Sequence, residues 1–318
     1  MIERKSGMQD RYSYGIGEWY GRSFVHLTPE ERLTYAELQL QPKRERADQP
    51  CLPRSTPRAT VLCTKEGGVC SIRLYKQGGA TGQVGVAPNE AGILCTTCPY
   101  RFYEAGRVFR WIGEQILGHG DPLVIGQVGF LEREDGRVVA DSEQSGPDDV
   151  GRIDHVLVHP HTTVLSWCAL EMQAVYFSGG SMKRDFRMIL DWTDPGLPFP
   201  AARRRLDYRS SGPKRLMPQL QIKVPTLRRW GKKMCVLVDQ SFYGALAPMD
   251  TVADLSNCDI AWFVVGYDER EGAASLVTRF VHFTTLERAV EGLTAGRAVS
   301  LSVFEERIRA KLERESAL

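Results

Sequence analysis

The stretch that decides the fold is GRIDHVLVHPHTTVLSWCALEMQ, residues 151–173. Two apolar runs flank a polar turn, which predicts two antiparallel strands joined as a hairpin. If the turn is centred between Thr162 and Thr163, Asp154 falls directly opposite Glu171. Opposed side chains have Cβ atoms about 4.5–5.5 Å apart, and two carboxylates at that distance repel unless a cation lies between them. This register therefore predicts a divalent cation with oxygen ligands, most simply Mg²⁺.

Glu171 and Gln173 stand two residues apart, so in a strand their side chains share one face. By itself this pattern also fits a half-exposed strand with two solvated polar residues. An Asp on one strand and Glu-x-Lys on its neighbour is the arrangement of PD-(D/E)XK nucleases, and this chain resembles it with Gln173 at the lysine position. Glutamine cannot take a proton but can orient a water, so the metal must lower the pKa of that water.

The bulk composition is that of a globular protein, with 318 residues, 42% hydrophobic and 25% charged. The N-terminal MIERKSGMQD lacks the apolar core of a signal peptide. The sequence has no run of about 18 apolar residues, so we expect no membrane span. We therefore expect a cytoplasmic protein with no membrane partner and with reduced cysteines, which, when clustered, are more often metal ligands than disulfides.

Three segments follow from the local patterns. Residues 1–40 form an N-terminal helical arm, because Thr28 is a helix N-cap followed by Pro29 and acidic residues. Residues 41–104 are rich in turns, carry five of the eight cysteines and have few long apolar runs, which predicts a small subdomain held by a metal. We expect residues 105–318 to form a PD-(D/E)XK-like catalytic and DNA-binding domain, for the reasons given below.

The third segment alternates strand-like and helical patterns. A helical period runs from about Phe102 and ends at Gly118. Strand-like runs cover residues 122–131, 150–158, 164–175, 233–239 and 258–268, and helical patterns cover 284–295 and 300–315. This alternation predicts an α/β fold with a mixed central sheet flanked by helices.

A basic segment, residues 203–233, holds eleven Lys or Arg and one acid, Asp207. Such a patch on a chain with a net charge of only +2 indicates a polyanionic partner, although a solvated basic surface is the alternative. Tyr208 and Trp230 are interleaved with the charges and could contact sugars and bases. The residues expected to contact double-stranded DNA are Arg209, Lys214, Arg215, Gln219, Gln221, Lys223, Arg228 and Arg229.

The cysteines fall into two groups. Cys168, Cys235 and Cys258 lie inside apolar strand-like runs, which predicts buried side chains. Five others are candidate metal ligands, and a tetrahedral site needs four: Cys51, Cys63, Cys70, Cys95 and Cys98. The CTTC motif at 95–98 would suit a zinc-ribbon half-site, so spacing alone leaves the ligand set open.

Motifs along the chain resemble the NotI-type restriction endonucleases. They are CLP at 51, Cys63, GVC ending at 70, CPYRF from 98, GRID with Asp154, ALEMQAVYFSGG and SNCDIAWFVV. The resemblance covers about residues 45–268. It implies a PD-(D/E)XK core with Glu-x-Gln, a four-cysteine metal-binding subdomain holding iron, or zinc, and homodimers that cut GC-rich palindromes built on GGCC.

Carried over residue by residue, the resemblance implies that Asp154, Glu171 and Gln173 are catalytic. It implies metal ligation by Cys51, Cys63, Cys70 and Cys98, with Cys95 left over. A further acid upstream of the Asp belongs to the family pattern, and Glu132, Asp135, Asp141 and Glu143 all remain candidates. For His155, which alternates away from Asp154, and for His159 and His161 in the turn, we expect structural roles.

These features predict a prokaryotic type II restriction endonuclease that hydrolyses both DNA strands with Mg²⁺ and leaves 5′-phosphate ends. One alternative is a repair or structure-specific nuclease on the same core. Another is a four-cysteine DNA-binding protein whose nuclease site is dead.

Overall fold

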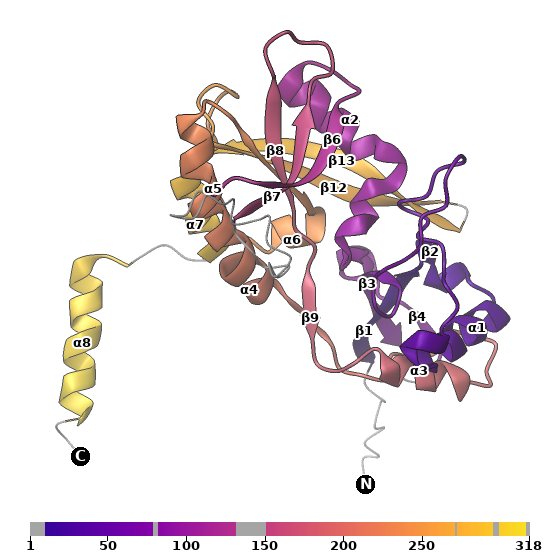
Figure 1. Ribbon diagram of the computed structural model, residues 1–318. Coiled ribbons are helices and arrows are strands. Elements are labelled where there is room, and N and C mark those ends of the chain that lie inside the picture. The colour runs from indigo at the N-terminus through magenta and orange to yellow at the C-terminus, as the bar shows by residue number, and fades with distance from the viewer. Residues whose placement is uncertain (1–9, 79–81, 132–150, 271, 295–298, 316–318) are drawn as a thin grey trace.

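Two larger sheets organise the chain, whose computed structural model describes residues 10–78, 82–131, 151–270, 272–294 and 299–315 (Figure 1). One sheet carries the predicted hairpin. The other is built mainly from the N-terminal part of the chain.

The first sheet has six strands in the order β13-β12-β11-β8-β7-β6. Their bounds are β6 (Leu123–Gly129), β7 (Arg152–Val158), β8 (Trp167–Met172), β11 (Met234–Asp239), β12 (Ile260–Arg270) and β13 (Ala273–Thr284). β11 runs parallel to both β8 and β12, and the other neighbours are antiparallel. The prediction of an α/β fold with a mixed sheet is confirmed.

The hairpin of β7 and β8 has the predicted register. His155 pairs with Leu170 and Val158 pairs with Trp167, which is the pairing that a turn centred between Thr162 and Thr163 produces. Continued by one residue, this register sets Asp154 opposite Glu171, and the backbone N–H of Asp154 donates to the carboxylate of Glu171 at 3.3 Å. The register follows from alternation, because a shift by one residue would turn the apolar side chains of β8 to the wrong face.

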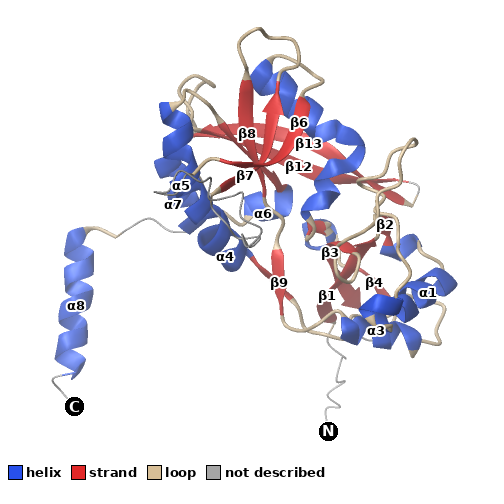
Figure 2. Cartoon of the chain, in the orientation of Figure 1, coloured by secondary structure: helices blue, strands red, loops and turns tan. Residues whose placement is uncertain are grey.

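Both faces of this sheet are covered, as Figure 2 shows. On one face the strand side chains pack with α5 (Met217–Arg229) and α7 (Leu286–Thr294). On the other face Leu170 and Met172 pack with α2 (Arg107–Ile112). α2 continues as a π-helical turn, η5 (Gly113–Leu117), and ends at Gly118 with φ +68°, as predicted. Because the sheet is covered, the polar Glu171 on β8 faces helix α5 and not the solvent.

The N-terminal residues are not only a helical arm. β1 (Arg11–Trp19) pairs antiparallel with β3 (Val69–Gln77), inside the segment expected to be a separate subdomain. Helix α1 (Pro29–Leu40) does form, and Thr28 caps it in a capping box with Glu31. The predicted boundary at residue 40 therefore does not follow the sheet. The pairing could not be seen in the sequence because the two strands lie about fifty residues apart.

The predicted boundary at residue 104 is also crossed. Helix α3 (Lys183–Leu190), which comes from the third segment, packs against α1. The ring of Phe186 on α3 stacks on Trp19 of β1 with their centroids 5.2 Å apart. Residues far apart in sequence thus build one N-terminal body.

Short elements complete the described chain. They are β2 (Arg22–Ser23), η1 (Phe24–His26), η2 (Lys43–Glu45), β4 (Val84–Val86), η3 (Asn89–Gly92), β5 (Cys95–Thr96), η4 (Pro99–Gly106), β9 (Tyr176–Ser178), β10 (Arg205–Asp207), α4 (Tyr208–Ser211), η7 (Gly212–Leu216) and α6 (Gln240–Gly244). Helix α8 (Leu301–Glu315) stands apart from the body in Figure 1. Among the described helices, none is both long enough and apolar enough to cross a membrane.

Candidate active site

Asp154 and Glu171 meet across the β7–β8 hairpin. The backbone N–H of Asp154 donates a hydrogen bond to Oε1 of Glu171 at 3.3 Å. Glu171 is 2% exposed, and burial raises its pKa to about 8, with the carboxylate of Asp154 acting in the same direction. The carboxylate of Asp154 therefore lies near enough to Glu171 to make a charge on Glu171 more costly.

Gln173 follows directly after β8. Its backbone N–H donates to the carbonyl of Leu237 at 2.9 Å, so it continues the ladder with β11. This keeps its side chain, which is 9% exposed, on the face of Glu171. Its amide Nε2 donates to the carbonyl of Ala174 at 2.5 Å. The orientation of the amide is therefore held by the backbone.

Lys223 also belongs to this site, although the sequence pattern predicted that it would contact DNA. Its Nζ lies 2.6 Å from Oε1 of Glu171 and 2.8 Å from Oε1 of Gln219. Lys223 is 1% exposed, which does not fit the expected contact with DNA from the surface. The burial of Lys223 could have been inferred from its position on the inner face of α5, next to Leu220 and Val224, which are buried. Within a basic segment, that signal was hidden by the surrounding charges.

The donor set suits a hard cation. Asp154 and Glu171 offer carboxylate oxygens and Gln173 offers an amide oxygen, which are the ligands that Mg²⁺ accepts. In the described part of the chain no group of three or more His, Cys, Asp or Glu side chains is gathered to hold a metal. A cation here would thus rely on the two carboxylates with amide, backbone or water oxygens. The candidate upstream acids, Glu132, Asp135, Asp141 and Glu143, lie outside the described residues.

The four implied cysteine ligands are neighbours. The thiols of Cys51 and Cys63 lie next to each other, and their interaction lowers the pKa of Cys51 and raises that of Cys63. Burial raises the pKa of Cys70, and the nearby Cys98 adds to it. The backbone N–H of Cys98 donates to the carbonyl of Cys70 at 3.1 Å. Among the described residues these thiols are not yet close enough together to form a metal site, so a bound metal would have to draw them together.

Cys95 lies in a different environment. Burial raises the pKa of its thiol, and the other groups near it are Asp239, Ser241 and Tyr208. A strand residue and a residue three positions later need not point the same way, so β5 separates Cys95 from Cys98. The two cysteines of the CTTC motif therefore face different neighbours.

A family model described as Restriction endonuclease NotI matches residues 36–277. The chain belongs to the NotI restriction endonuclease family. It is therefore a site-specific deoxyribonuclease and binds DNA. No curated protein matches the chain. The match includes the hairpin with Asp154 and Glu171 and all five candidate cysteines, whereas α8 lies outside it.

In this NotI-family chain the first part of the basic segment lies beside the candidate site. β10 pairs with β9, which begins three residues after Gln173. The guanidinium of Arg215 lies 3.9 Å from the ring centroid of Tyr176 and donates to its hydroxyl at 2.7 Å. Arg209 and Lys214 are exposed and line a hollow of about 820 Å³. This end of the segment therefore lies close to the strand that follows the candidate site.

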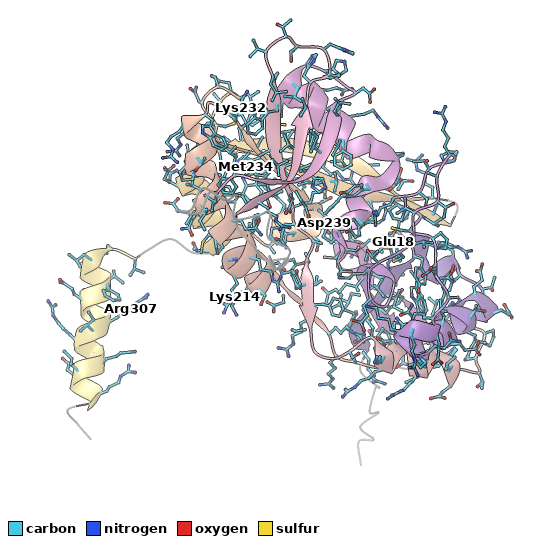
Figure 3. The ribbon with its side chains drawn as sticks, viewed as in Figure 1. Glu18, Lys214, Lys232, Met234, Asp239 and Arg307 are labelled. Carbon is cyan, nitrogen blue, oxygen red and sulfur yellow. The ribbon has the colours of Figure 1, made fainter. Side chains whose placement is uncertain are left out.

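The second part of the segment lies at the opposite end of the sheet. In Figure 3, Met234 and Asp239 mark the two ends of β11, and Lys232 lies near Met234. Arg228 is here and pairs with Asp259 at 2.5 Å and with Glu287 at 3.4 Å. The exposed Gln221, Arg229 and Trp230 lie on the same stretch, from α5 to the residue after it. The predicted DNA contacts therefore do not form one group.

The histidines of the hairpin contact other side chains of the protein, and the remaining cysteines are buried. Nε2 of His155 is hydrogen-bonded to the hydroxyl of Tyr103, on the sheet face opposite Glu171. His159 and His161 lie in the turn, with the ring of His119 4.6 and 5.4 Å from theirs. The three strand-associated cysteines are at most 2% exposed, as predicted: Cys168, Cys235 and Cys258.

Proposed function

We propose that this NotI-family enzyme hydrolyses both strands of a GC-rich palindromic duplex containing GGCC, with Mg²⁺, and leaves 5′-phosphate ends. The observation that carries the proposal is the pair of facing carboxylates, Asp154 and Glu171, with Gln173 beside them on a PD-(D/E)XK-like hairpin. The recognition sequence comes from the family resemblance.

The residues have separate tasks in this reaction. Asp154 and Glu171 would hold the cation, and Gln173 would orient the attacking water through its amide oxygen. When bound, Mg²⁺ supplies the Lewis acidity that lowers the pKa of the water and offsets charge on the phosphate. The water oxygen forms a bond to phosphorus, the bond from phosphorus to O3′ breaks, and O3′ leaves with a proton. The phosphate stays on the 5′ end.

Cys51, Cys63, Cys70 and Cys98 would hold a structural metal, iron by resemblance or else zinc. Their mutual proximity supports this set, and the separate surroundings of Cys95 support its exclusion. Four thiolates suit either metal in tetrahedral geometry.

A homodimer is proposed because a two-fold DNA site calls for a two-fold protein. Helix α8 offers a surface for it: all its described side chains are exposed, including the apolar stripe Leu301, Phe304, Ile308 and Leu312. An antiparallel copy centred near Ile308 would set Glu305 against Lys311, an acid against a base. An isolated helix of 15 residues is marginal in water, so a second α8 is the occupant we infer. Light scattering of the Ile308→Glu protein should then give a smaller mass than the wild-type protein.

Digestion of a large sequenced DNA with Mg²⁺, followed by sequencing of the fragment ends, tests the activity. We expect every end to map to one palindrome with GGCC and to carry a 5′-phosphate. Cutting at branched DNA whatever its sequence would support the repair nuclease instead. Tight specific binding without any cutting would support the inactive four-cysteine DNA-binding protein.

A further inference from the structure

A buried lysine contacts the proposed catalytic glutamate from a neighbouring helix. Nζ of Lys223 lies 2.6 Å from Oε1 of Glu171, with 1% and 2% of the two residues exposed. Its other oxygen partner, Gln219, stands one helical turn earlier on α5. Both acceptors are therefore held on the rigid face between α5 and the sheet.

Packing alone gives no reason for a lysine at this position. Its helix neighbours Leu220, Val224 and Leu227 are at most 1% exposed and form an apolar stripe. An apolar residue at 223 would extend that stripe without the cost of desolvating an ammonium. Buried ion pairs are often no more stabilising than apolar residues of similar volume. The lysine is thus better explained by what it does to Glu171.

The sequence motif also lacks a cation at its third position. Gln173, two residues after Glu171, is neutral, whereas Asp154 and Glu171 are both acids. Lys223 reaches the same carboxylate from a different element, 52 residues further along the chain. A cation is therefore present in the site, but it comes from α5 and not from β8.

We propose that Lys223 is a positioning residue that supplies from α5 the ammonium missing from the Glu-x-Gln strand and fixes the carboxylate of Glu171. By holding Oε1, it leaves the second oxygen of Glu171 for the catalytic cation. The inference rests on the proposed function, since it assumes that Glu171 is catalytic.

The test compares Lys223→Gln, which keeps an N–H donor but loses the charge, with Lys223→Gln/Gln173→Lys, which returns a lysine to β8. We expect single-turnover cleavage by Lys223→Gln to fall about 100-fold, equivalent to about 2.7 kcal/mol. The double variant should recover at least about tenfold, which a purely structural role would not permit. Without DNA, Ca²⁺ should still raise the thermal midpoint of Lys223→Gln, because both carboxylates remain.

Two controls keep the outcomes distinct. Lys76→Gln breaks an ion pair between Lys76 of β3 and Asp10, away from the site, and should cut at the wild-type rate. Glu171→Gln should lose both cleavage and the Ca²⁺ effect, and a Glu171→Gln protein that still cuts would refute the catalytic assignment itself. If Glu171→Gln is inactive, Lys223→Gln cutting within about threefold of wild type would overturn only the positioning role. A double variant no faster than Lys223→Gln, or a Lys223→Gln protein that fails to fold, would also overturn it.

Discussion

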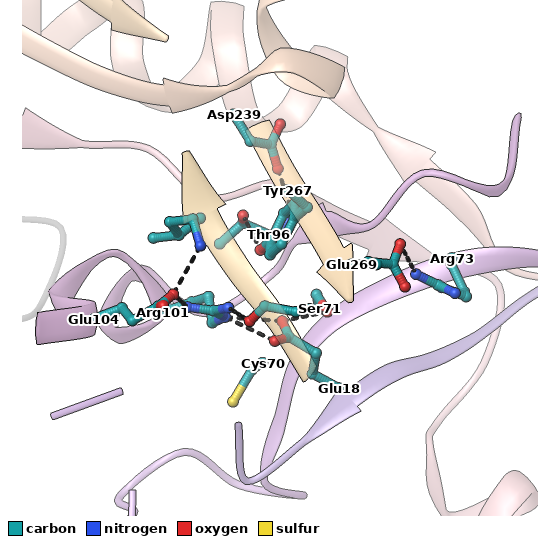
Figure 4. A network of polar contacts seen from close by, with 12 residues as sticks. Glu18, Cys70, Ser71, Arg73, Thr96, Arg101, Glu104, Asp239, Tyr267 and Glu269 are labelled. Carbon is teal, nitrogen blue, oxygen red and sulfur yellow. Dashed lines mark hydrogen bonds and ion pairs between the residues drawn. The ribbon is translucent and has the colours of Figure 1, made fainter. Parts of the chain in front are cut away.

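Nε of Arg101 on η4 lies 2.9 Å from both carboxylate oxygens of Glu18 on β1, in a network that excludes solvent (Figure 4). The two residues are 2% and 0% exposed. The same guanidinium donates to the carbonyl of Ala274 on β13 at 2.7 Å, and Ser71 on β3 donates to Glu18 at 2.8 Å. The pair therefore joins the N-terminal sheet to the β12–β13 hairpin of the catalytic sheet.

Arg101→Met should lower the free energy of unfolding by about 3–5 kcal/mol, because it leaves the carboxylate of Glu18 buried without its cation. Urea denaturation monitored by circular dichroism measures this loss. Arg44→Met is the control, since Arg44 pairs with Glu45 at an exposed position and should change stability by less than about 1 kcal/mol. A loss of similar size for both variants would refute the role of the buried pair.

Gln173→Leu should abolish cleavage, because leucine cannot orient the attacking water. We expect a fall of about 100-fold or more in the single-turnover rate. Gln173→Lys restores the commoner motif and should stay active, because a lysine can also hold water and phosphate. The rates are measured at saturating Mg²⁺ on a short duplex with the cleavage site. An active leucine variant would show that Gln173 is only a neighbour of the site.

Arg209→Gln and Lys214→Gln should weaken binding to all DNA sequences. Each lost phosphate contact should reduce the slope of log K against log salt concentration by about 0.9. Arg228→Gln should change the slope less, since its guanidinium is held by Asp259 and Glu287. Fluorescence anisotropy over a salt series measures the slopes, with Ca²⁺ in place of Mg²⁺. Unchanged slopes for Arg209 and Lys214 would place the DNA elsewhere.

Serine in place of Cys51, Cys63, Cys70 or Cys98 should remove the structural metal, of which we expect about one ion per chain. Because the backbone N–H of Val175 donates to the carbonyl of Thr96 at 2.8 Å, disorder around Cys98 should reach the segment after β8 that carries Gln173. DNA recognition should then fail while the main sheet stays folded. Elemental analysis of purified variants measures the metal.

Cys95→Ser is the matched control for that series and should keep both metal and activity, because its thiol faces Asp239 and Ser241. If Cys95→Ser loses the metal while one of the other four variants keeps it, the ligand assignment is wrong. The CTTC half-site would then replace it.

His282→Gln should flatten the loss of stability on acidification. Burial lowers the pKa of His282 below its ordinary 6.5, against a smaller opposing effect of a backbone hydrogen bond with Met249, and Tyr243 is hydrogen-bonded to its Nδ1. The unfolded chain therefore binds the proton more readily, so wild-type stability falls as the pH drops from 6.5 through the lower, folded-state pKa. Urea unfolding at about pH 7.5, 6.5 and 5.5, chosen above, at and below the ordinary histidine pKa of about 6.5, compares the slopes. Equal slopes would exclude this contribution.

The sequence alone was sufficient for features that depend on neighbouring residues. Thr28 caps α1 and Gly118 ends the helix that follows α2, because caps and left-handed residues act within one turn. The closeness of Asp154 and Glu171 could also be predicted, since a polar turn and strict alternation leave one register that buries the apolar side chains. The choice of Cys98 over Cys95 came from resemblance and not from spacing.

Only the tertiary structure decided what joins distant segments. It paired β1 with β3. It also linked Glu18 to Arg101, 83 residues apart, and placed Lys223 against Glu171, 52 residues apart. A lysine in a basic run has the same local pattern whether it is solvated or buried. Its environment depends on how α5 lies on the sheet, and that is set by the packing of apolar side chains from many elements together, which no local stretch specifies.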